Sequence, residues 1–161
     1  MSTRSSISVH ARVAEPRHER GLIDTSVVID LERLDSTDLP SEIAVSAVTL
    51  AELAAGPHAT GDPDERARRQ DRLQRTEATF DPLPVDGAVA RAYGRVYAAV
   101  AGAGRKARGR RAFDLLIAAT ALAAELPLYT RNPRDFQELG GLLEVVPVPM
   151  AITRRRASST S

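Results

Sequence analysis

The fold is decided by the stretch GLIDTSV, residues 21–27. A short apolar run is followed at once by Asp24, by the hydroxyls of Thr25 and Ser26, and by the apolar start of a helix. A carboxylate at the end of a buried strand lies where α/β proteins commonly bind their ligands. Asp24 is therefore the first candidate site residue. A purely structural role as the N-cap of the following helix would explain an aspartate at this position equally well.

Outward from this stretch, short apolar runs alternate with segments of helical periodicity. We expect strands at 22–23, 43–45, within 80–85, at 127–129 and at 142–148, and helices at 26–33, 47–55, 64–79, 87–101, 111–125 and 133–138. Strands that alternate with helices predict an α/β protein whose central sheet is mainly parallel and flanked by helices.

The bulk composition fits one domain of this kind. The chain has 161 residues, 43% of them hydrophobic, with 22 Lys and Arg against 21 Asp and Glu and no cysteine. The lack of cysteine excludes disulfides and thiolate metal sites. We expect a disordered arm at 1–20, one domain at 21–150 and a disordered basic tail at 151–161. No apolar run is long enough to cross a bilayer, so we expect a cytoplasmic protein without membrane contact.

Three further segments set polar groups among apolar neighbours, and each group has a structural explanation. Glu52 stands three residues after Thr49, which is the spacing of a capping box. Asp114 falls in the first turn of its predicted helix, where the helix dipole favours an anion. Asn132 and Asp135 suit the N-cap and N3 positions of a short helix.

Taken together, the same groups predict a cation site. Asp24 and Asn132 each follow a strand, while Glu52 and Asp114 lie early in helices that start from the same edge of the sheet. Acids in apolar surroundings are costly unless something positive meets them. A hard divalent cation neutralises several carboxylates at once, so the pattern favours Mg²⁺, for which Mn²⁺ can substitute.

Four segments together resemble the motifs of the PIN-domain ribonucleases, and most of all the VapC-type toxins of bacterial toxin–antitoxin pairs. They are LIDTSV (22–27), VTLAEL (48–53), FDLLIAA (113–119) and YTRNPRDF (129–136). The resemblance implies a PIN-like three-layer α/β/α sandwich. It also implies a Mg²⁺-dependent endoribonuclease that inhibits translation or growth, forms homodimers and is neutralised by a VapB-type antitoxin.

The resemblance further implies roles for individual residues. Asp24, Glu52 and Asp114 match the acidic metal ligands of the family. Asn132 stands where the family has a fourth acid, and Asp135 follows three residues later. The expected catalytic residues are Asp24, Glu52, Asp114, Asn132 and Asp135.

Substrate contacts are expected from hydroxyls and arginines near these acids. The segment RKARGRR (105–111) places five cations just before Asp114, where they would draw RNA phosphates toward an acidic centre. Contact with an antitoxin and a simply solvated loop are the alternatives for this segment. The candidate RNA-binding residues are Thr25, Ser26, Arg108, Arg110, Arg111 and Arg131.

Other functions remain as alternatives. The asparagine at position 132 keeps open a catalytically degenerate PIN domain that binds RNA or a partner without cutting. A nucleotide-binding α/β protein is disfavoured because neither G-x-G-x-x-G nor G-x-x-x-x-G-K-[ST] occurs in the chain. A DNA flap nuclease is disfavoured because the chain has no room for added DNA-clamping elements.

Overall fold

The computed structural model describes residues 18–151. The elements follow in the order β1 (Arg20–Ile23), α1 (Thr25–Asp30), η1 (Leu31–Arg33), η2 (Ser36–Asp38), β2 (Glu42–Val45), α2 (Ala47–Ala55), η3 (Gly56–Ala59), α3 (Pro63–Thr79), α4 (Gly87–Gly102), α5 (Arg110–Ala123), β3 (Leu128–Thr130), η4 (Pro133–Leu139) and β4 (Val145–Pro147). The elements labelled η are short 3₁₀ helices. No helix within this range is long and apolar enough to span a lipid bilayer.

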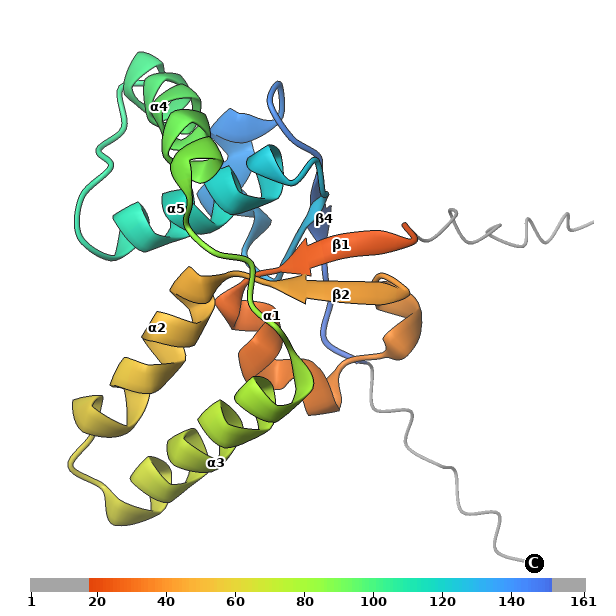
Figure 1. The fold of residues 1–161 in the computed structure, drawn as a ribbon, viewed down its shortest axis with the longest axis vertical. Coiled ribbons are helices and arrows are strands. Elements are labelled where there is room, and N and C mark those ends of the chain that lie inside the picture. The colour runs from red at the N-terminus through yellow and green to blue at the C-terminus, as the bar shows by residue number, and fades with distance from the viewer. Residues whose placement is uncertain (1–17, 152–161) are drawn as a thin grey trace, which may run out of the picture.

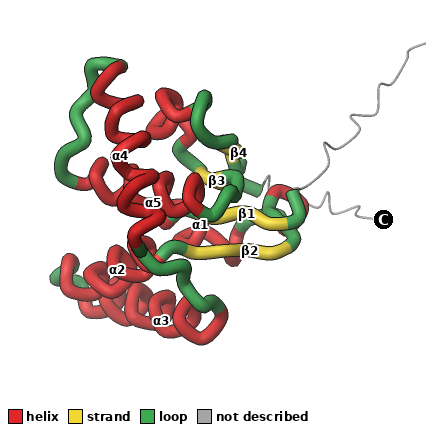
Figure 2. The backbone as a smooth tube through the Cα atoms, turned by 45° about the horizontal axis from the view of Figure 1, so that its top comes forward, coloured by secondary structure: helices red, strands yellow, loops and turns green. Residues whose placement is uncertain are grey.

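Within residues 18–151, four strands form one parallel sheet in the order β2-β1-β3-β4. The register sets Ile23 of β1 opposite Val45 of β2 and Tyr129 of β3. Helices α4 and α5 cover one face of the sheet, and α1, α2 and α3 lie on the other (Figures 1 and 2). The prediction of an α/β/α sandwich around a parallel sheet is confirmed.

The core is divided between these two faces because successive side chains of a strand point in opposite directions. Leu22 packs in the cluster that contains Val96 of α4 and Ile117 of α5. Its neighbour Ile23 packs in the second cluster, with Val27 of α1. All five side chains are fully buried, and each such burial contributes about 1.5–3 kcal/mol. β1 therefore reads as a continuous apolar run and lies in the middle layer.

The pairing of β1 with β3 depends on a glycine. A Cβ atom at Gly21 would lie 2.5 Å from Cε2 of Tyr129, so the aromatic ring occupies the space that any other side chain would need. This close approach helps to fix the two strands whose carboxyl ends carry Asp24 and Thr130.

The structure differs from the expected elements at three places. The helix expected at 26–33 is α-helical only to Asp30 and continues as η1. The strand expected within 80–85 is reduced to a single bridge between Leu83 and Ser46. Pro82 and Pro84 flank that bridge and have no N–H to extend the ladder. β1 begins one residue inside the segment expected to be an arm. The predictions of a disordered arm and a disordered basic tail otherwise concern residues 1–17 and 152–161, which lie outside the described residues.

Candidate functional site

A pocket of about 520 Å³ lies at the carboxyl edge of the sheet. Residues from α1, α2, α5 and η4 line it together with the end of β1. The lining comprises Asp24, Thr25, Ser26, Ile29, Asp30, Glu52, Arg110, Asp114, Asn132, Asp135 and Phe136. The structure thus brings together all five residues that the sequence nominated as catalytic.

Asp24 forms the floor of this pocket and caps α1 at the same time. Its carboxylate accepts hydrogen bonds from the backbone N–H of Val27 at 3.1 Å, from Ser26 Oγ at 2.5 Å and from Thr130 Oγ1 at 2.5 Å. The residue is only 5% exposed. Burial raises the pKa of Asp24 and outweighs the hydrogen bonds, which lower it. The capping and site interpretations of this residue are therefore compatible.

Thr130 is a site residue that the sequence analysis did not nominate. It is fully buried, donates to Asp24, and accepts the backbone N–H of Asn132 at 3.0 Å. The register that pairs Ile23 with Tyr129 makes Asp24 and Thr130 the next residues along their two strands. The sequence signal for Thr130 is a hydroxyl at the end of a predicted strand. Its hydrogen bond to Asp24, however, follows only from the pairing of β1 with β3.

Glu52 is not part of a capping box, so that interpretation of its spacing from Thr49 is wrong. α2 is capped by Ser46, whose hydroxyl accepts the backbone N–H of Val48 at 3.1 Å. Because the helix begins at Ala47, Glu52 lies in its second turn. The hydroxyl of Thr25 donates to Glu52 Oε1 at 2.7 Å and lies 3.1 Å from the hydroxyl of Thr49. A contact between α1 and α2 therefore orients this glutamate.

Asp114 lies in the second turn of α5 rather than the first, because α5 begins at Arg110. Burial and the nearby charges of Glu52, Asp135 and Asp24 raise the pKa of Asp114 to about 6, against a smaller lowering effect of Arg110. The helix-dipole explanation is accordingly weakened, since the effect is confined to the first turn. The negative charge around Asp114 is only partly compensated by Arg110.

Asn132 and Asp135 occupy the predicted positions at the start of η4. Asn132 is the N-cap residue, yet its side chain makes no capping hydrogen bond. The backbone N–H of Asp135 donates to the carbonyl of Asn132 at 3.0 Å. Both side chains line the pocket, so capping does not account for either of them.

The candidate RNA-binding arginines divide into two groups. Arg110 lines the pocket and Arg108 is exposed. Arg111 instead pairs with Glu138 at 3.1 Å, and Arg131 pairs with Asp30. Intramolecular carboxylates therefore already hold Arg111 and Arg131, and their contact with RNA stays a prediction.

The two candidate hydroxyls are engaged within the protein as well. Thr25 donates to Glu52, while Ser26 donates to Asp24 and accepts the backbone N–H of Arg131 at 3.1 Å. Both hydroxyls thus contact acids of the pocket directly, and their contact with RNA stays a prediction.

The chemistry of this donor set fits a hard divalent cation. Carboxylate and amide oxygens are the ligands that Mg²⁺ and Mn²⁺ prefer, and Arg110 is the single Lys or Arg among the residues that line the pocket. The carboxylates do not, however, form a ready cluster. Within residues 18–151, no three His, Cys, Asp or Glu side chains are arranged to hold a metal ion.

Comparison with known proteins agrees with the motifs. The model of the PIN domain family matches residues 21–142. Ribonuclease VapC5 of Mycobacterium tuberculosis is 39% identical over 128 residues, which cover 78% of this chain and 91% of that protein. Ribonuclease VapC8 of the same species is 41% identical over 102 residues, covering 63% and 89%.

A solved structure agrees as well. The crystal structure of VapBC-5, a member of the VapBC family of toxin–antitoxin systems from Mycobacterium tuberculosis, superimposes with a TM-score of 0.71 at 39% identity. The match covers 81% of this chain and 99% of that one.

Proposed function

The chain belongs to the PIN-domain family, among the VapC ribonucleases, and on this premise we propose that it is a metal-dependent endoribonuclease toxin. The proposed reaction is hydrolysis of RNA phosphodiester bonds with Mg²⁺ or Mn²⁺, and its consequence is inhibition of translation or growth. Two relatives are named as ribonucleases, and one solved structure is that of a toxin–antitoxin system. These names support the reaction class and the biological role.

One observation carries the proposal. Five carboxylates, Asp24, Asp30, Glu52, Asp114 and Asp135, line one pocket. Asp30 is paired with Arg131 and Arg33, whereas the charges of Glu52, Asp135 and Asp24 help to raise the pKa of Asp114. An arrangement that is unfavourable for the empty protein is expected where a cation binds, because the cation removes the repulsion.

The residues of the pocket suit distinct tasks in such a reaction. A bound divalent cation would polarise a phosphate oxygen and lower the pKa of a coordinated water. Asp24 is held rigidly by its three hydrogen bonds, and Asp114 faces it from α5, so these two are the proposed ligands together with Glu52. Glu52 can also orient the attacking water, because Thr25 fixes its carboxylate. Arg110 can meet a phosphate at the mouth of the pocket.

The partners follow from the same premise. We propose a VapB-type antitoxin as the inhibitor and a homodimer as the active assembly. The support for the antitoxin is the toxin–antitoxin system to which VapBC-5 belongs.

Cleavage of RNA by the purified protein tests the proposal. Structured RNA is incubated with Mg²⁺, with Mn²⁺ or with EDTA, and new 5′ ends are mapped, with DNA of the same sequence as a control substrate. We expect ends that require the cation, appear only with RNA and disappear in Asp114→Asn. Equal products from wild type and Asp114→Asn would contradict the proposal.

A catalytically degenerate domain remains the second candidate. Asn132 removes one carboxylate from the fourth acidic position, and the described carboxylates form no ready metal cluster. This alternative predicts RNA or partner binding that is independent of added cation, with no cleavage under any condition. The assay above, combined with a binding measurement in EDTA, separates the two.

A further inference from the structure

Glu138 is a carboxylate outside the pocket that holds two arginines. Its side chain is only 6% exposed. Oε2 accepts a hydrogen bond from Arg111 Nη2 at 3.1 Å, and Oε1 accepts one from Arg105 Nη1. Burial by itself would raise the pKa of Glu138, but its own backbone N–H and the two guanidinium groups outweigh burial and lower it. The group is therefore held as an ionised counter-ion for both arginines.

The contacts of Glu138 join three segments that are far apart along the chain. Arg105 lies in the connector between α4 and α5, Arg111 lies in the first turn of α5, and Glu138 itself lies in η4. Gly104 and Gly109 in this connector have φ angles of 74° and 63°, a conformation that favours glycine. The start of α5 also has no side-chain cap. The ion pairs with Glu138 tie this connector and the start of α5 to η4.

The same pair of segments carries part of the acidic pocket. Asp114 follows Arg111 by three residues on α5, and Asp135 precedes Glu138 by three residues in η4. Both carboxylates line the same pocket, and the charge of Asp135 helps to raise the pKa of Asp114. We infer that Glu138 is a positioning residue, which fixes the first turn of α5 against η4 and thereby sets the placement of Asp114 relative to Asp135.

The same contacts determine which cations of the basic segment already have a carboxylate partner. Arg105 and Arg111 are occupied by Glu138. Lys106, Arg108 and Arg110 are exposed and form no ion pair among the described residues. The inference assigns the attraction of RNA to these three cations alone. This part of the inference rests on the proposed function.

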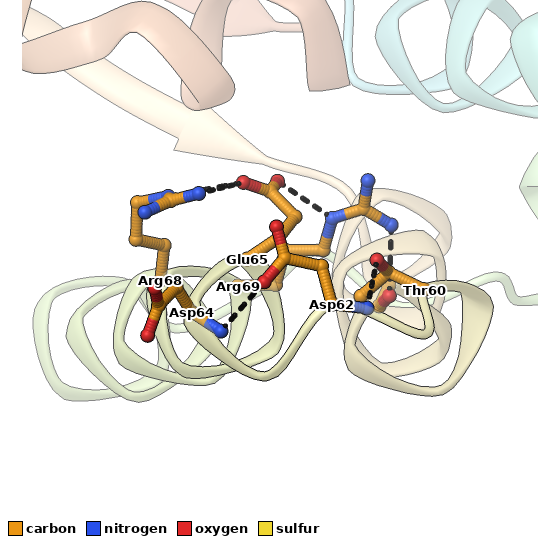
Figure 3. Close-up of polar contacts among 7 residues, drawn as sticks. Thr60, Asp62, Asp64, Glu65, Arg68 and Arg69 are labelled. Atoms are coloured by element: carbon orange, nitrogen blue, oxygen red, sulfur yellow. Dashed lines mark hydrogen bonds and ion pairs between the residues drawn. The ribbon is translucent and has the colours of Figure 1, made fainter.

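The test compares Glu138→Gln with a matched control. Glu65 of α3 also pairs with two arginines, Arg68 and Arg69, but all three belong to one helix away from the pocket (Figure 3). Affinity for manganese chloride is measured by calorimetry, and kcat and KM are measured with RNA, well below the melting temperature of each variant. We expect Glu138→Gln to lose about tenfold in Mn²⁺ affinity and in kcat, and Glu65→Gln to match wild type in both.

A double-mutant cycle sharpens the assignment. If Glu138 acts through Arg111, then Arg111→Gln weakens Mn²⁺ binding as well, and the double variant is no worse than the more severe single one. Additive losses would overturn an action through this pair.

Glu138→Gln overturns the inference if it differs from Glu65→Gln only in melting temperature. Should Glu138→Gln not fold, Glu138→Asp keeps the charge and withdraws it by one methylene, and Mn²⁺ affinity equal to that of wild type would then overturn the inference. A wild-type protein that binds Mn²⁺ but cuts no RNA would remove the proposed function alone, since the Mn²⁺ titrations still decide the role of Glu138.

Discussion

Helix α3 and the acidic pocket carry their charges in opposite ways. On α3, Glu65 pairs with Arg68 and Arg69 at 2.9 Å, and Asp71 pairs with Arg75 at 3.0 Å, all at spacings of three or four residues. The pocket draws its acids from α1 and its N-cap residue, α2, α5 and η4, and its lining includes a single arginine. The acids Glu65 and Asp71 are paired within α3, although Arg75 also pairs with Glu32 of η1. In the pocket, Asp30 is paired with Arg131, whereas Asp24, Glu52, Asp114 and Asp135 form no ion pair among the described residues.

The pKa shifts show the same contrast. Hydrogen bonds from Arg69 and Arg68 lower the pKa of Glu65, so its neighbours favour the ionised form. Burial and neighbouring carboxylates raise the pKa of Asp114 to about 6, so its surroundings disfavour the ionised form of this carboxyl group. The comparison teaches that ion pairs within one helix support the fold, while the gathered carboxylates lower stability in a way that a bound cation would relieve.

The largest expected effect is the loss of activity when a charge is removed from the pocket, compared with the removal of a charge from α3. Asp114→Asn should lower kcat/KM for RNA by at least about a hundredfold, because loss of a supporting contact to a metal ligand alone costs about 10–100-fold. Asp71→Asn on α3 should leave kcat/KM unchanged. Initial rates with a labelled RNA check both, and a comparable loss in Asp71→Asn would break the distinction between the regions.

An intermediate effect on stability and activity is expected when a hydroxyl is removed from the pocket, compared with the removal of a hydroxyl from α3. Thr130→Val deprives the buried carboxylate of Asp24 of a hydrogen bond. We expect a loss of about 1–2 kcal/mol in the free energy of unfolding and about a tenfold loss of activity. Thr79→Val on α3 removes an exposed hydroxyl that donates to the carbonyl of Arg75, and should change stability by less than about 0.5 kcal/mol.

Urea unfolding and initial rates measure these two substitutions. A Thr130→Val protein with wild-type activity would show that Asp24 does not depend on this hydroxyl for its placement.

The pH dependence of stability should come from the pocket. The pKa of Asp114 rises from an ordinary 3.8 to about 6 on folding, so the folded state binds more protons. Its contribution favours folding below about pH 4 and is lost as pH rises through 6. Allowing for solvent screening of a half-exposed group, the loss is about 1–2 kcal/mol.

Melting curves in EDTA check this sign. Asp114→Asn carries no charge at any pH, so it should melt a few degrees above wild type at pH 7.5 and close to wild type at pH 4. A difference that is the same at both pH values would contradict the assignment.

The smallest effect is expected for Glu65→Gln. Its pairs with Arg68 and Arg69 are partly exposed and screened by solvent, so the melting temperature should change by less than about 2 °C and the change should shrink in high salt. Calorimetric melts at low and high salt measure it. A large drop that salt does not reduce would mean that α3 is held by these pairs rather than by the packing of Leu73 and Thr76.

The polar segments were predictable where the information is local. The apolar run of β1 placed Asp24 at the end of a strand, and Pro133 placed Asn132 and Asp135 at the start of η4. The cap of α2 was misassigned to Thr49, because hydroxyls at both 46 and 49 suit a capping position and only the end of β2 selects Ser46. Likewise, the prolines around Leu83 reduced an expected strand to one bridge.

The tertiary contacts of the site lay beyond such reasoning. Thr130 meets Asp24 across 106 positions of sequence, and Arg111 meets Glu138 across 27. The sequence showed Arg111 as one cation in a basic run, and only the fold turned it toward a buried carboxylate.

By itself, then, the amino-acid sequence determined the alternation of strands and helices, the acids at their ends and the family to which the chain belongs. Hydrophobic periodicity and backbone preferences act over a few residues, so they can be read directly along the chain. The strand order β2-β1-β3-β4, the hydroxyls that hold Asp24 and Glu52, and the arginines that pair with Glu138 were decided only by the tertiary structure. These contacts join residues whose separation in sequence says nothing about their distance, because packing of the two core clusters sets which segments meet.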